Sequence, residues 1–121
     1  MDEKFDTGDI IDVRYFPIDH NSMTAFDVEF QTRGVLLGLF YDIMEMIADR
    51  RTLPRLKQKN GIVYHSRADL EKQKVIRLEN ILDIDLDRYA RAFWFPPYDG
   101  ACLEINGQRH TVVPQSILRK M

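Results

Sequence analysis

The stretch that decides the fold is Ala101-Cys-Leu-Glu-Ile-Asn106-Gly107-Gln-Arg-His-Thr-Val-Val113. Two runs with strand character flank the Asn106-Gly107 dipeptide. A type I′ turn needs positive φ at both central positions, and asparagine followed by glycine adopts it readily. The sequence therefore predicts a β-hairpin over 101–113, closed by Pro114.

Five further segments have strand patterns. Residues 10–16 mix β-branched and aromatic residues, and 24–31 carry apolar residues at every second position, so we expect these two to pair as a hairpin. Residues 62–64 follow a turn and predict a brief strand. In 82–86 leucine and isoleucine alternate strictly with aspartate, which favours a strand, although the same region also fits helical spacing. A last strand is expected at 90–95, before two prolines.

Residues 35–50 carry the strong amphipathic helix pattern of the chain, with apolar residues three and four positions apart and acidic residues opposite. Ser66, followed three residues later by Asp69, predicts a helix N-cap and a helical turn to about residue 74. Whether the rest of 67–81 is helix or strand stays open. A final helical turn is expected within 115–121.

These elements predict one α+β domain spanning 1–121, mainly antiparallel β-sheet with one principal helix at about 35–50 and a C-terminal β-hairpin. A chain of 121 residues with 45% hydrophobic and 30% charged residues suits a single globular domain. Cys102 is the sole cysteine, which excludes an intrachain disulfide. The sequence opens without a secretory signal and holds no apolar run long enough to span a bilayer, so a cytoplasmic location is expected.

No catalytic motif stands out. His20, His65 and His110 are far apart, and no nucleophile elbow or phosphate-binding glycine pattern is present. The row Asp83, Asp85 and Asp87 could hold a divalent cation in a small enzyme, but a solvated strand face explains it better. We therefore expect no catalytic residue, no metal site and no cofactor.

Charge is distributed very unevenly along the sequence. Residues 1–49 hold three basic and eleven acidic residues, whereas 50–77 hold nine basic and two acidic ones. Such a basic block, placed on loops and element ends, is typical of a surface that contacts phosphates. The candidate nucleic-acid-binding residues are Arg50, Arg51, Arg55, Lys57, Lys59, Arg67 and Arg77.

The order of elements resembles the LytTR-type DNA-binding domain of bacterial response regulators. In this chain the helix at 35–50 is followed by the basic segment Leu53-Pro54-Arg55-Leu56-Lys57-Gln58-Lys59 and then by the strand at 62–64. The segment 81–85 and the Asn106-Gly107 hairpin are similar to the closing elements of that family. The resemblance implies DNA binding and transcription regulation, with Arg55, Lys57 and Lys59 as phosphate contacts.

The function expected from the sequence is therefore a non-catalytic regulatory module that binds DNA through 50–77. The alternative is a protein-interaction or self-association module, a barrel or pleckstrin-like sandwich, in which the acidic first half of one chain meets the basic middle of another. The expected partners are nucleic acid, a second copy of the chain or another protein, and no membrane.

Overall fold

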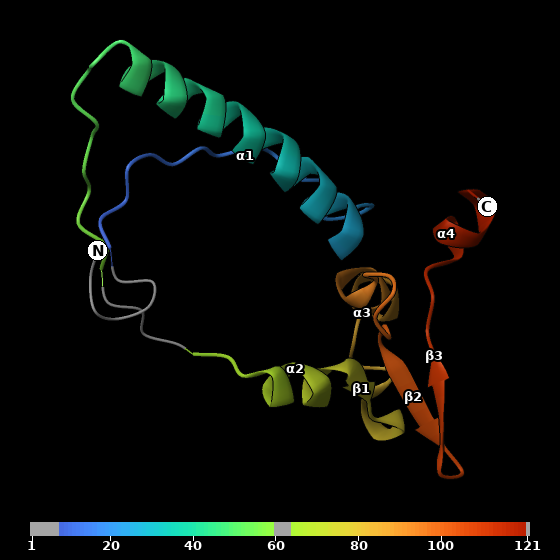
Figure 1. Cartoon of the computed structure of the whole chain (residues 1–121). Helices are drawn as coiled ribbons and strands as arrows, with labels where there is room; N and C mark the ends of the chain where they lie inside the picture. Colours follow the sequence, from blue (N-terminus) through green and yellow to red (C-terminus); the bar gives the residue numbers. More distant parts are fainter. Residues whose placement is uncertain (1–7, 60–63, 121) are drawn as a thin grey trace. The chain divides into compact units, whose positions relative to one another are not determined.

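The computed structural model describes residues 8–59 and 64–120 (Figure 1). Internal contacts divide the chain into two units. Unit 1 comprises Met1–Pro17 and Gln31–Tyr64, and unit 2 comprises Ile18–Phe30 and His65–Met121. The long helix α1 (Ala25–Ala48) begins in unit 2 and continues into unit 1. The single-domain organisation of 1–121 stays a prediction.

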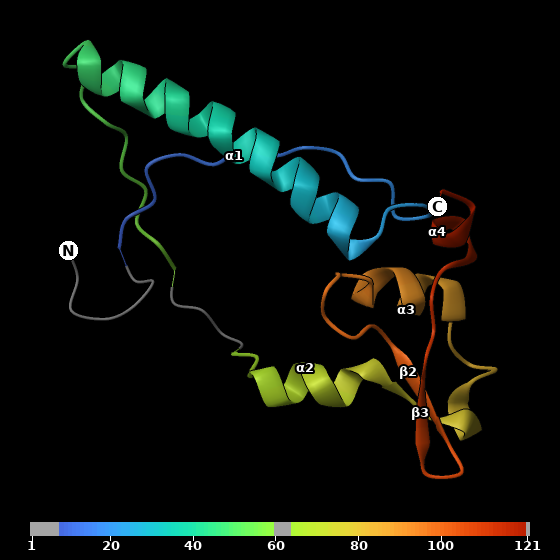
Figure 2. The same ribbon diagram turned by 45° about the vertical axis from the view of Figure 1, so that its right-hand side comes forward.

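The sheet of unit 2 contains the predicted hairpin. Strand β2 (Cys102–Ile105) pairs antiparallel with β3 (Gln108–Thr111), and Ile105 lies opposite Gln108 across the turn. Asn106 has φ 52° and Gly107 has φ 76°, as the type I′ turn requires. The hairpin prediction is thus confirmed. A third strand, β1 (Val75–Ile76), pairs with β2 in parallel, with Val75 opposite Cys102. Figure 1 labels β1, and Figure 2 shows the hairpin of β2 and β3 from a second side.

Short helices make up much of the rest of unit 2. Ser66 caps α2 (Arg67–Lys74) through a reciprocal capping box with Asp69, as the sequence predicts. The segment left open between helix and strand is therefore α2, then β1, then the 3₁₀ helix η1 (Leu78–Asn80). The expected C-terminal turn forms α4 (Gln115–Lys120).

Residues 82–95, predicted to form two strands, instead form a turn followed by α3 (Leu86–Phe93). The cause is a helix cap, because the Asp85 side chain accepts a hydrogen bond from the Arg88 backbone N–H at 3.1 Å. The α+β class is confirmed, but the prediction of a mainly antiparallel sheet is wrong. The described residues form a three-stranded mixed sheet with four α-helices.

Helix α1 begins ten residues earlier than predicted, so the expected strand at 24–31 is helical. Thr24 and Asp27 form a capping box: the Thr24 N–H donates to the Asp27 carboxylate at 3.0 Å, and the Asp27 N–H donates to the Thr24 hydroxyl at 3.1 Å. Within the predicted strand at 10–16, Ile10 forms a single antiparallel bridge with Leu56. The expected strand at 62–64 falls largely outside the described residues.

The most buried side chains of unit 2 come from elements far apart in sequence. Ile76 of β1, Ala90 of α3, and Ala101 and Cys102 at the start of β2 are at most 7% exposed. Thr24 and Pro114 are also fully buried. Among the described residues, no helix is both long and apolar enough to cross a membrane.

Candidate functional site

The seven basic residues predicted to bind nucleic acid are divided between the two units. Arg50, Arg51, Arg55, Lys57 and Lys59 belong to unit 1, at the end of α1 and in the segment that follows it. Arg67, the first residue of α2, and Arg77, the N-cap of η1, belong to unit 2. All seven side chains are exposed. Two of them pair with acids: Arg51 with Asp49 at 3.2 Å and Arg77 with Glu79 at 3.9 Å. Their role stays a prediction.

A buried arginine organises the polar centre of unit 2. Arg91, in α3, has a side chain only 8% exposed, and its Nε donates to the Asp87 carboxylate at 2.8 Å. Its Nη1 donates to the carbonyl oxygens of His20 at 2.8 Å and Met23 at 3.3 Å. Because these carbonyls lie in the loop before α1, Arg91 fixes that loop to α3.

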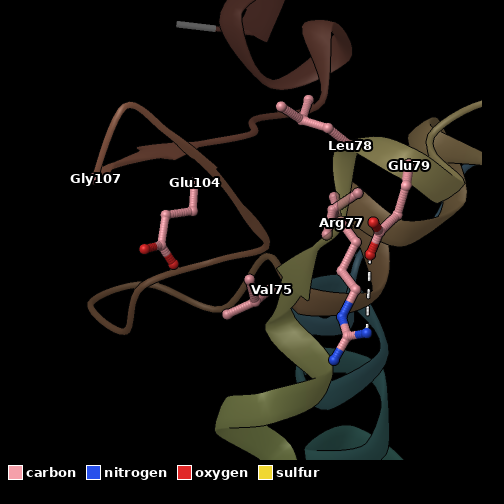
Figure 3. A pocket seen from close by; sticks show the side chains of 7 residues that line it. Val75, Arg77, Leu78, Glu79, Glu104 and Gly107 are labelled. Carbon is pink, nitrogen blue, oxygen red and sulfur yellow. Dashed lines mark ion pairs between the residues drawn. The ribbon is translucent and has the colours of Figure 1, made fainter.

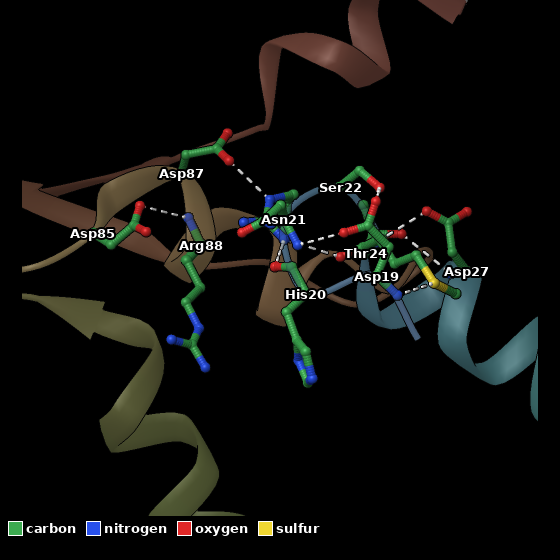
Figure 4. Close-up of polar contacts among 11 residues, drawn as sticks. Asp19, His20, Asn21, Ser22, Thr24, Asp27, Asp85, Asp87 and Arg88 are labelled. Atoms are coloured by element: carbon green, nitrogen blue, oxygen red, sulfur yellow. Dashed lines mark hydrogen bonds and ion pairs between the residues drawn. The ribbon is translucent and has the colours of Figure 1, made fainter. Parts of the chain in front are cut away.

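The loop itself is folded around Asp19. The Ser22 hydroxyl donates to one carboxylate oxygen of Asp19 at 2.6 Å, and the Asn21 N–H donates to the other at 2.9 Å (Figure 4). The Ser22 hydrogen bond, followed by that of Asn21, lowers the pKa of Asp19 below its usual value of 3.8, and the positive charge of Arg91 adds to this. The loop is therefore a preformed turn held at neutral pH by an ionised carboxylate.

Helix α1 starts against the end of α3. The Phe26 N–H donates to the Trp94 carbonyl at 3.0 Å, which satisfies one of the free donors of the first turn. The rings of Phe26 and Phe95 lie 6.1 Å apart, and those of Phe95 and Tyr98 are stacked at 6.1 Å. The chain from Phe93 to Tyr98 thus joins α3, the start of α1 and the turn before β2 in one rigid corner.

An open hollow of about 460 Å³ lies beside β1 (Figure 3). Val75 and Leu78 supply apolar surface to it, and the Arg77–Glu79 ion pair and Glu104 of β2 supply charge. Gly107, at the hairpin turn, completes the lining. The hollow thus combines a small apolar surface with charges of both signs.

Two smaller hollows adjoin this one along α3. One of about 220 Å³ shares Val75, Ile76 and Arg77 with the first, and another of about 420 Å³ shares Ile84 and Tyr89 with the second. The Tyr89 hydroxyl donates to the Gln73 carbonyl at 2.6 Å, which fixes the wall between them. Shared lining residues thus link the first hollow to the second and the second to the third.

Within residues 8–59 and 64–120, no group of three or more His, Cys, Asp or Glu side chains lies close enough to hold a metal ion. Asp83, Asp85 and Asp87 do not form the predicted row on a strand. Asp85 caps α3 and Asp87 pairs with Arg91. The strand predicted over this region concealed the role of Arg91. The signal in the sequence is the i, i+4 spacing of Asp87 and Arg91, which indicates an ion pair only if 86–93 is a helix.

The chain matches no protein-family model. It is similar to the methionyl-tRNA formyltransferase of Novosphingobium aromaticivorans, with 27% identity over 120 residues that cover 98% of this chain and 36% of that protein. Its fold is similar to the crystal structure of a 4-N formyltransferase from Francisella tularensis, with a TM-score of 0.78 and 26% identity over 93% of this chain and 47% of that one. The chain therefore spans less than half the length of either relative.

These similarities correct the function expected from the sequence. The two relatives are formyltransferases, which contradicts the LytTR resemblance, the non-catalytic DNA-binding role and the assignment to transcription regulation. The self-association alternative gains no support from them either. The LytTR pattern begins with strands, but the structure has an extended segment at 10–16 and a helix from residue 25. The segment 81–85, compared with a closing element of that family, forms turns before α3. The chain is similar over nearly its whole length to parts of two formyl-transferring enzymes.

Proposed function

We propose that this protein transfers a formyl group to an amine nitrogen of a small molecule. The observation that supports formyl transfer is that a similarity in sequence over 98% of the chain and a similarity in fold over 93% both lead to formyltransferases. Both relatives are named formyltransferases: one for methionyl-tRNA, the other for transfer to a 4-N position.

The reaction needs few chemical components. The lone pair of the acceptor nitrogen forms a bond to the formyl carbon, the bond between that carbon and the donor breaks with its electron pair going to the donor, and the nitrogen loses a proton. No atom changes oxidation state, so no oxidant or reductant is required. What the protein must supply is a position for the acceptor, a base for the proton and donors for the developing oxyanion.

Charge favours a small acceptor over a tRNA. Counted over the units rather than along the sequence, unit 1 has eight basic and eight acidic residues, and unit 2 has nine basic and eleven acidic ones. Neither unit has the basic excess with which proteins attract a polyanion. We therefore assign the acceptor to the small-molecule class.

Within this chain, we place the acceptor in the hollow beside β1. Arg77 can bind an anionic or hydroxyl group of the acceptor, while Glu79 and Glu104 can accept hydrogen bonds from its amine or hydroxyl groups. Val75 and Leu78 supply the apolar surface. The stacked corner at Phe95 and Tyr98 and the Arg91 contacts hold the surrounding elements in place.

The test uses a chimera in which this chain replaces its matching segment in the Francisella protein. It is supplied with a formyl donor accepted by the Francisella enzyme, labelled in the formyl group, together with either that enzyme's acceptor or methionyl-tRNA. We expect the label on the small acceptor. Label on methionyl-tRNA would contradict the acceptor class, and label on neither would contradict formyl transfer.

A pair of variants tests the hollow. Arg77→Ala should raise KM for the acceptor about tenfold while kcat changes little, because it removes one charged hydrogen bond made in the ground state. Arg67→Ala is the matched control, since Arg67 is also an exposed arginine of unit 2 but does not line the hollow. An equal rise in KM in the two variants would show that the acceptor does not bind in the hollow.

A further inference from the structure

The hydroxyl of Tyr89 connects two helices of unit 2. Tyr89 lies on α3, and its hydroxyl donates to the Gln73 carbonyl at 2.6 Å. Gln73 is the last residue but one of α2, so its carbonyl is among the final four of that helix, which have no donor within the helix. The Tyr89 hydroxyl supplies a donor to one of them. The hydrogen bond therefore fixes the C-terminal end of α2 to α3.

The ring of Tyr89 packs on its own helix and reaches the first strand. Its centroid lies 5.2 Å from that of Phe93, one turn further along α3, with the two planes tilted by 46°. The Tyr89 side chain is half-buried and borders both smaller hollows. In the smaller of these it shares the lining with Val75, Ile76 and Arg77. One side chain thus contacts the end of α2 and lies beside β1.

Strand β1 follows α2 directly, beginning at Val75 after the last residue of that helix. It is two residues long, which is shorter than most strands, and Val75 lies opposite Cys102 in its pairing with β2. Because so short a strand forms few ladder hydrogen bonds, its position also depends on the element before it. The hydrogen bond of Tyr89 is therefore a second contact that fixes β1, beside its pairing with β2.

Arg77 comes directly after β1. It is the N-cap of η1 and lines the large hollow together with Val75 (Figure 3). Its guanidinium pairs with Glu79 at 3.9 Å, which is longer than a hydrogen bond between charged groups, and the two side chains are 75% and 72% exposed. Such an exposed pair does little to fix either side chain. The place from which Arg77 enters the hollow is therefore set by the backbone of β1.

We propose that Tyr89 is a positioning residue for the acceptor in the hollow beside β1. Its hydroxyl holds the end of α2, the end of α2 holds β1, and β1 places the Arg77 guanidinium where it meets the acceptor. Tyr89 does not line that hollow, so it acts through Arg77. Because a hydrogen bond weakens as its distance and angle depart from the optimum, a small shift of Arg77 lowers the affinity for the acceptor. The inference rests on the proposed function for the place of the acceptor.

Two tyrosine variants of the chimera with the Francisella protein test this role. Tyr89→Phe removes the hydroxyl and keeps the ring that packs on Phe93. We expect it to raise KM for the acceptor of the Francisella enzyme about threefold with kcat nearly unchanged, because the lost hydrogen bond displaces Arg77 without removing it. Tyr98→Phe is the matched control, since Tyr98 also packs on a phenylalanine ring of unit 2 but borders none of the three hollows. It should leave KM unchanged.

A double-mutant cycle with Arg77→Ala separates positioning from a general loss of structure. If Tyr89 acts through Arg77, Tyr89→Phe has no further effect once the guanidinium is absent, and the double variant has the KM of Arg77→Ala. The same threefold rise in KM with and without Arg77 would show a purely structural role and would overturn the inference. Circular dichroism establishes that each variant keeps its helices.

The other outcomes separate this inference from formyl transfer. An unchanged KM in Tyr89→Phe, an equal rise in Tyr98→Phe, or a fall in kcat alone contradicts the positioning role while transfer stands. If the unsubstituted chimera transfers no formyl group, the proposed function fails, and the dissociation constant of the same acceptor, measured by calorimetry, replaces KM in the cycle. Binding that Tyr89→Phe weakens only when Arg77 is present then supports the positioning role by itself. Absence of acceptor binding overturns both.

Discussion

At the scale of single residues, Arg91 has the largest effect that the structure predicts. A guanidinium that is 8% exposed and bonded to one carboxylate and two carbonyls leaves three acceptors without a donor when it is removed. Hydrogen bonds from a charged donor contribute about 1.5 to 3 kcal/mol each at most, and two of the acceptors are in a loop that can rehydrate.

We therefore expect Arg91→Met to lower the free energy of unfolding by about 2 to 3 kcal/mol. The measurement is urea unfolding followed by circular dichroism. Arg88→Met is the control on the same helix, because Arg88 is exposed and its change should cost less than about 0.5 kcal/mol. Similar losses in the two variants would show that the Arg91 contacts are not a stabilising centre.

At the scale of elements, the sequence correctly predicted the turns and helix caps that depend only on neighbouring residues. The Asn106-Gly107 turn and the Ser66-Asp69 capping box depend on the backbone preferences of adjacent residues, and both are confirmed. At 24–31 and 82–86, the alternation of apolar and polar residues wrongly predicted strands. A capping box at Thr24 and a cap at Asp85 start helices there instead. β1 is two residues long and exists only through its pairing with β2, which no local pattern records.

The end of α1 gives a second prediction. The Arg50 N–H donates to the Ile47 carbonyl and the Arg51 N–H to the Met46 carbonyl, which is the Schellman motif, and Arg50 has φ 55°. Side chains with a Cβ are strained in this left-handed conformation by about 1 kcal/mol, whereas glycine is not.

Two substitutions that both remove the Arg50 charge isolate this strain. Arg50→Gly should give a free energy of unfolding about 1 kcal/mol higher than Arg50→Ala, measured by urea unfolding with α1 followed by circular dichroism. Position 51 is the control because Arg51 is not among the residues with positive φ. There glycine should be no better than alanine, and the same preference at both positions would contradict the strain argument.

At the scale of the whole molecule, the candidate site was beyond prediction because it is built from long-range neighbours. The hollow joins Val75 and Arg77 to Glu104, and Arg91 joins α3 to carbonyls about seventy residues earlier. Charge shows the same effect. Along the sequence, residues 1–49 have a net charge of −8 and residues 50–77 a net charge of +7. When the residues are grouped by contact instead, unit 1 has a net charge of 0 and unit 2 a net charge of −2. The uneven distribution of charge along the sequence therefore did not indicate a nucleic-acid partner.

The same charge balance yields the last prediction, which concerns Lys57 and Lys59. Both are exposed in unit 1, and they were the phosphate contacts implied by the LytTR resemblance. With a small acceptor, the double variant Lys57→Gln, Lys59→Gln should leave kcat/KM of the chimera unchanged, and salt should affect the two proteins alike. If the acceptor were tRNA held by these lysines, kcat/KM would fall and its dependence on log salt would become shallower by about 2, one unit for each lost phosphate contact. The measurement is kcat/KM at several salt concentrations, with Lys72→Gln as a single-lysine control in unit 2.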